Sequence, residues 1–171
     1  MCDGRKLAKG FGRVVAMAAA LLTLLFGGCV RNEFDVEVSL PEKVSGHYSF
    51  LYYASDPAKG WFAEEMMMVE KGKGSVTGHT RNPSLVWIMD ASGRPAALFY
   101  AERGDRIRIT GDSENPASWR VKGNDVTGRI DGWRHSNRAA LSSMDARKVN
   151  AAVSGYVREN PSDPVSAILM A

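Results

Sequence analysis

The chain has 171 residues, of which 44% are hydrophobic and 24% are charged. This composition is typical of a globular protein and excludes a disordered or fibrous chain. Its 22 lysine and arginine residues exceed its 19 aspartate and glutamate residues, but residues 1–28 hold four of the basic residues and one of the acidic ones. The remainder is neutral, with 18 residues of each sign, so the charge balance does not indicate a nucleic-acid partner.

The first residues have the pattern of an export signal. Basic residues between Arg5 and Arg13 precede an uncharged apolar run at residues 14–26, which is shorter than the ~20 residues that span a bilayer. A basic flank, a short apolar run and small residues at its end are typical of a secretory signal peptide. We therefore predict that residues 1–28 form a signal peptide and are removed from the mature protein.

Cys29 stands directly after this segment. The sequence Leu-Phe-Gly-Gly-Cys at residues 25–29 resembles the lipobox of bacterial lipoproteins, with Phe26 where a smaller side chain is commoner. The resemblance implies that the Cys29 thiol receives a diacylglyceryl group, and two or more acyl chains hold a protein stably on a membrane. The alternatives are an uncleaved anchor or an ordinary signal peptide with a chance cysteine. We expect a lipoprotein of the bacterial cell envelope, at the periplasmic or surface face of the outer membrane, with residues 29–33 as a tether.

Residues 34–123 have the pattern of a β domain. Apolar side chains alternate with polar ones at residues 34–40 and again at 106–110, which indicates half-buried strands. Residues 62–70 are ambiguous, because alanine, glutamate and methionine favour a helix whereas the length and flanks suit a strand. About eight short strands separated by turn residues predict an antiparallel β-sandwich or a small barrel. The expected strands are 34–40, 47–54, 62–70, 75–79, 84–90, 96–101, 106–110 and 119–122.

Residues 124–171 are predicted to form a helical segment. Helical spacing relates Ile130, Trp133, Arg134, Asn137 and Leu141, which predicts a first helix. An apolar stripe over residues 149–157 predicts a second, amphipathic helix. Asp145 is the expected N-cap of that helix, and Pro164 is expected at the first position of a third. The third helix is short, so we expect the chain to be a truncated product or the front part of a longer protein.

The residues that could carry catalysis or bind a metal are scattered. His47, His79 and His135 are far apart in the sequence and include no close pair of the kind that metal sites use. Asp105 and Asp112 flank a predicted strand and are best explained as turn and solvent-facing residues, although paired carboxylates can act in acid–base catalysis. We predict no catalytic residues, no metal site and no cofactor.

Aromatic residues are the candidate binding surface. Alternation along residues 48–53 places Tyr53 on the face opposite Tyr48, and Trp61 and Trp87 lie in or beside neighbouring strands. Exposed aromatic side chains are typical of surfaces that bind a glycan, a peptide or a partner protein. Packing in the core is the competing explanation. Tyr53, Trp61 and Trp87 are the residues we assign to a binding surface.

Three stretches carry a resemblance to a known family. They are the strand pair at residues 99–112, the short strand at 119–124 and the helical linker at 156–167, which contains Asn-Pro-Ser-Asp-Pro-Val-Ser. The order of elements over residues 34–171 resembles the N-terminal domain of unknown function of Bacteroidetes-type lipoproteins. In that family the domain precedes a thioredoxin-like domain, either a thiol–disulfide oxidoreductase or a peroxiredoxin relative. The Trp-Cys-x-x-Cys of the redox domain does not occur in this chain, so the resemblance assigns redox activity to none of its residues.

Two functions follow as hypotheses. The resemblance implies a non-catalytic, membrane-anchored module that positions or dimerises a thioredoxin-like domain. The aromatic residues favour a stand-alone binding lipoprotein of the cell envelope, which recognises a glycan, a peptide or a partner protein. Both hypotheses include attachment to a membrane through the lipid on Cys29.

Overall fold

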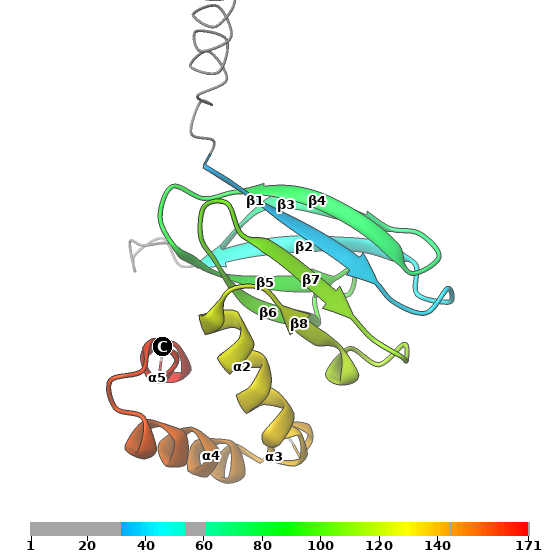
Figure 1. The fold of residues 1–171 in the computed structure, drawn as a ribbon. Helices are drawn as coiled ribbons and strands as arrows, with labels where there is room; N and C mark the ends of the chain where they lie inside the picture. Colours follow the sequence, from blue (N-terminus) through cyan, green and yellow to red (C-terminus); the bar gives the residue numbers. More distant parts are fainter. Residues whose placement is uncertain (1–31, 54–60, 144, 171) are drawn as a thin grey trace, which may run out of the picture. The chain divides into compact units, whose positions relative to one another are not determined.

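The computed structural model describes residues 32–53, 61–143 and 145–170, without the side chains of residues 61–64. Within these ranges the chain forms eight strands followed by helices (Figure 1). The predicted order of a β domain and then a helical segment is confirmed. The described residues from Asn32 onward belong to one compact unit, so the helices and the strands form the same body.

The strands form two four-stranded sheets that face each other. The strand pairs are antiparallel with one exception, and the sheets are not closed into a barrel, so the β-sandwich prediction is confirmed. The first sheet has the order β4-β1-β7-β8, with bounds Lys73–His79, Glu33–Ser39, Arg106–Thr110 and Arg120–Lys122. The second sheet has the order β3-β2-β5-β6, with bounds Trp61–Val69, Gly46–Tyr53, Ser84–Asp90 and Pro95–Ala101.

The core lies between the two sheets and follows from the alternation of each strand. In β1 the side chains of Phe34, Val36 and Val38 are buried, and the residues between them are exposed. The Phe34 ring contacts the ring of Phe99 from the second sheet, with ring centroids 5.9 Å apart in an edge-to-face arrangement. Such pairs add to the stabilisation from burying apolar area, so they help to hold the sheets face to face.

The ambiguous segment at residues 62–70 is a strand. It is β3, which pairs with β2 and turns into β4 through Lys71 and Gly72. Gly72 has a φ of +75°, and a Cβ atom there would lie 2.0 Å from the Leu40 carbonyl oxygen. Glycine is therefore required at this turn for both backbone conformation and space. The tight turn leads the chain directly into β4. Pairing with β2 holds the helix-favouring residues of β3 in a strand.

The pairing of β1 with β7 was not predicted. Asp35 to Ser39 run parallel to Arg106 to Thr110, within sheets that are otherwise antiparallel. Two parallel strands cannot be joined by a short hairpin. The long connection between them places β1 in the interior of the first sheet, between β4 and β7.

The helical segment contains one break that the sequence pattern did not predict. The helix expected to run through Leu141 is divided at Asn137 into α2 (Asp125–Ser136) and α3 (Arg138–Ser142). The Asn137 backbone leaves helical geometry, with φ −106° and ψ 16°. Its backbone N–H and its side-chain amide both donate to the Trp133 carbonyl. The expected cap and the expected proline start are confirmed, because α4 (Ala146–Glu159) is capped by Asp145 and α5 (Pro164–Met170) begins at proline.

Helix α2 closes one side of the sandwich by bonding to an edge strand of each sheet. The Thr127 hydroxyl donates to the Tyr100 carbonyl at 2.7 Å and accepts from the Tyr100 N–H at 3.0 Å, on edge strand β6. The Asp131 carboxylate accepts from the Val121 N–H at 3.0 Å, on edge strand β8. Thr127 and Asp131 are four residues apart and therefore lie on the same helix face. Both side chains are buried, so α2 satisfies backbone groups that an edge strand would otherwise expose.

Candidate functional site

The structure places two of the predicted binding residues together. Tyr53 on β2 and Trp87 on β5 both line one cavity at the outer face of the second sheet. Tyr53 is 37% exposed and Trp87 is half-buried. Cys29 and the Trp61 side chain lie outside the described residues.

The cavity has a volume of about 580 Å³ and lies between the second sheet and the helices. Its size is within the range of about 300–1,000 Å³ that is common for small-molecule sites. The space is not part of the sandwich core, because the sheet residues that line it point away from the other sheet. We call it the outer cavity.

The sheet side of the outer cavity follows from strand alternation. In β5 the side chains of Val86 and Ile88 enter the core, so Leu85 and Trp87 face outward. Trp87 pairs with Leu98 of β6, and Leu85 pairs with Tyr100. Large apolar side chains on neighbouring strands therefore form one continuous wall. The wall residues are Tyr53, Leu85, Trp87, Leu98 and Tyr100.

The helix side is apolar as well, but its side chains are incompletely covered. Val149 and Val153 of the amphipathic helix α4 line the outer cavity, with Ile168 and Leu169 of α5. No residue of α4 is fully buried. An amphipathic helix ordinarily buries its apolar stripe against a core. Here the stripe faces a partly empty space, which makes this region the best candidate for ligand binding.

One carboxylate fixes the position of the helices that form this wall. Asp163, in the turn between α4 and α5, pairs with Arg129 of α2 at 3.1 Å and accepts from the Tyr156 hydroxyl of α4 at 2.9 Å. It also accepts from the Val165 N–H at 2.9 Å, at the start of α5. That backbone hydrogen bond, supported by Tyr156 and Arg129, lowers the pKa of Asp163 although burial opposes the shift. The charged carboxylate therefore joins three helices behind the cavity.

Two polar groups of α2 accompany the apolar lining. The indole Nε1 of Trp133 is buried and has no hydrogen-bond partner within the described part of the chain. Arg134 is the one charged residue among the described residues that line the cavity. Its Nη2 atom donates to the Trp119 carbonyl and lies 3.5 Å from Asp131. Burial lowers the pKa of the Arg134 guanidinium, while Asp131 opposes that effect.

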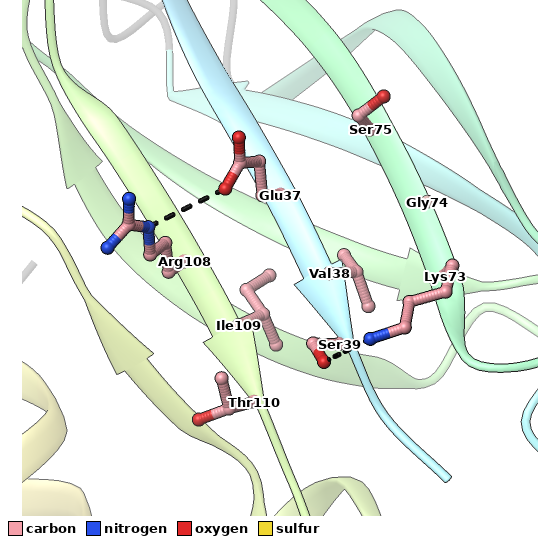
Figure 2. Close-up of a pocket in the computed structure, with 9 residues that line it drawn as sticks. All are labelled: Glu37, Val38, Ser39, Lys73, Gly74, Ser75, Arg108, Ile109 and Thr110. Atoms are coloured by element: carbon pink, nitrogen blue, oxygen red, sulfur yellow. Dashed lines mark hydrogen bonds and ion pairs between the residues drawn. The ribbon is translucent and has the colours of Figure 1, made fainter. Parts of the chain in front are cut away.

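A second recess lies on the outer face of the first sheet and has a different character (Figure 2). There Arg108 of β7 pairs with Glu37 of β1 at 3.5 Å, and Lys73 of β4 donates to the Ser39 hydroxyl at 2.6 Å. These charged side chains find their partners on neighbouring strands, and the recess is open to solvent. This pattern is typical of the solvated face of a mainly antiparallel sheet, so the outer cavity is the stronger candidate.

The remaining titratable residues do not assemble into a metal centre within the described ranges. His79 lies 3.2 Å from Glu65 and 3.5 Å from Glu33, at an exposed junction between the two sheets. His135 lies beside the buried Asp131, and burial, together with Arg120, lowers its pKa. None of the described helices has both the length and the apolar character needed to span a bilayer.

The comparisons with known proteins give no assignment. Neither a family model nor a curated protein matches the chain. The sequence pattern indicated Tyr53 and Trp87 as binding residues but not the helix wall opposite them. The stripe at residues 149–157 was a usable signal, because an amphipathic helix needs an apolar surface to pack against.

Proposed function

We propose that the protein is a membrane-anchored, non-catalytic lipoprotein that binds an apolar ligand in the outer cavity. The observation that carries the proposal is the half-open cavity of about 580 Å³ between Trp87 on the sheet and the apolar stripe of α4. Apolar cavities with a small number of polar groups are the usual form of ligand sites. The leader and Cys29 support the anchor, since they match the pattern of exported lipoproteins.

Uptake of a neutral apolar fluorophore tests the binding function. The full chain is purified in a fluorinated surfactant and titrated with N-phenyl-1-naphthylamine, with one saturable site expected. Val153→Trp places a larger side chain in the cavity and is expected to weaken the fluorophore's affinity about tenfold, or about 1.4 kcal/mol. Leu98→Trp fills the same space from the sheet and should have the same effect.

Met68→Trp is the matched control, because Met68 is 50% exposed on β3 and does not line the outer cavity. Its affinity for the fluorophore should stay within about twofold of the parent's. An equal loss in the control, or no saturable uptake by the parent, would contradict the proposal. Thermal unfolding of each variant shows whether the fold is retained.

The anchor is tested separately at Cys29. Cys29→Ser is expected to accumulate as an unprocessed precursor that incorporates no radiolabelled palmitate, because the thiol that accepts the lipid is lost. The chain offers a matched control in Cys2, which lies at the start of the leader. Cys2→Ser should be processed and labelled like the parent. Normal labelling of Cys29→Ser would refute attachment at this residue.

The resemblance to modules that precede a thioredoxin-like domain stays a prediction. This role and ligand binding can coexist in one protein. Asp163 joins the helices to one another, and helices joined in this way would hold a following domain in a fixed orientation. A reading frame that continues past codon 171 into Trp-Cys-x-x-Cys would support this second role. A stop codon at that point would argue against it.

A further inference from the structure

The polar groups beside the outer cavity narrow the class of ligand. The walls are apolar on both sides, so the body of the ligand is hydrocarbon or aromatic. The buried Trp133 Nε1 is a donor without a partner among the described residues. That atom is covered by protein atoms even when the cavity is empty, so it offers no contact to a ligand in the open space.

The charge of Arg134 is a second constraint on the class of ligand. Arg134 is the one charged side chain that the described lining contributes. Asp131 lies 3.5 Å from it, but the same carboxylate also pairs with Arg120 at 2.8 Å. Two guanidinium groups therefore share one carboxylate, and the cluster retains positive charge. The two interactions of Arg134 in the described structure both involve Nη2, which leaves other N–H groups of its planar fork for an acceptor.

We propose that the outer cavity binds one long-chain acyl group, with its hydrocarbon between Trp87 and Val153 and its carboxyl or ester oxygen at Arg134. The inference rests on the proposed binding function and specifies its ligand. The oxygen would come either from a free fatty acid or from the ester of a lipid. Both sources present the same acyl chemistry to the cavity.

Photoaffinity labelling tests the location of the chain. The full-length protein, in a fluorinated surfactant, is irradiated with a 16-carbon fatty acid that carries a diazirine near its methyl end. Mass spectrometry should find the label on peptides that contain Trp87, Leu98 or Val153. Unlabelled palmitate should compete for that labelling. Label that is concentrated at the exposed Met66 and Met68, or that palmitate does not displace, would overturn the proposal.

Chain length gives a quantitative criterion. Each buried methylene contributes about 0.8 kcal/mol, so affinity should rise up to about fourfold per carbon from octanoate towards palmitate, until the cavity is filled. No dependence on length would overturn an acyl site. In that case the cavity could still bind the compact apolar fluorophore, and the proposed function would stand. Failure of the acyl inference is therefore distinguishable from failure of the proposed function.

One variant tests the polar end. Arg134→Gln should weaken palmitate more than methyl palmitate, because it removes a charge that only the carboxylate needs. N-phenyl-1-naphthylamine has no such oxygen, so its affinity for Arg134→Gln should fall less than that of palmitate. Equal losses for all three ligands would overturn the assignment of the oxygen to this end.

Competition with a diacyl phospholipid separates the two sources. If palmitate displaces the diazirine fatty acid but dispersed phosphatidylcholine does not, the site is assigned to free fatty acids. Displacement by both assigns it to acyl chains in general, including those of the membrane. Displacement by neither overturns the proposal.

Discussion

Asp163 shows how a single residue can determine the position of a larger segment. It accepts hydrogen bonds from Val165 and Tyr156 and pairs with Arg129. Its side chain is 10% exposed, whereas that of Arg129 is 38% exposed. The pair is therefore partly screened by solvent, and its contribution lies between those of a surface and a buried ion pair.

Replacing Asp163 should change how stability depends on pH. Asp163→Asn keeps an acceptor for the Val165 N–H but loses the charge, so the free energy of unfolding at pH 7 should fall by about 1–2 kcal/mol. The folded-state pKa of Asp163 lies below its unfolded value, which is about 3.9. The stability that the charged carboxylate adds to the wild type is therefore fully present above that unfolded pKa. It disappears as pH falls through the lower, folded-state pKa.

Urea denaturation at pH 7, 5 and 3 measures this difference. The gap between wild type and Asp163→Asn should be similar at pH 7 and 5 and smaller at pH 3. Asp145→Asn is the control, since Asp145 also caps a helix through a backbone N–H but has no ion pair in the described structure. A gap that does not shrink in acid would show that the charge of Asp163 does not matter.

At the scale of elements, helix α2 depends on the pair Thr127 and Asp131. Thr127→Val preserves the shape of the side chain but removes the hydroxyl that bonds to both backbone groups of Tyr100. Because the site is buried, we expect the free energy of unfolding to fall by about 1–3 kcal/mol. Amide exchange at Tyr100 should accelerate in the same variant.

Thr77→Val is the control for this prediction. Thr77 is exposed on β4, and its hydroxyl donates to Asp35 at 3.0 Å. Its replacement should change stability by no more than about 0.5 kcal/mol. Denaturation curves of the two variants provide the comparison, and equal effects would mean that α2 is not held to β6 through Thr127.

The elements that the sequence predicted well are those whose own residues determine them. Alternation over residues 34–40 and 106–110 places their apolar side chains in the core whichever strand lies beside them. The division at Asn137 was missed, because it is a departure of one residue's backbone angles, φ −106° and ψ 16°, which the spacing of side chains does not record. The segment at residues 62–70 was ambiguous because pairing with β2 overrides helix propensity there.

At the scale of the whole molecule, half of the site was predictable. Strand alternation placed Tyr53 and Trp87 outside the core, as the sequence indicated. The opposite wall was not predictable, because α4 and α5 are positioned by contacts between residues distant in the sequence, such as Arg129 with Asp163. A sequence pattern shows that a helix has an apolar face but not which surface that face will meet.

The parallel pairing of β1 with β7 has a consequence for the order of folding. The second sheet contains the pairs β2–β3 and β5–β6, whose strands follow each other along the chain. In contrast, β1 emerges first and cannot complete its pairing until β2 to β6 have all been made. Closing so long a loop slows folding. A nascent chain therefore carries the apolar row of Phe34, Val36 and Val38 unprotected on its way to the native state, which is the interval in which aggregation competes and a chaperone would be most useful.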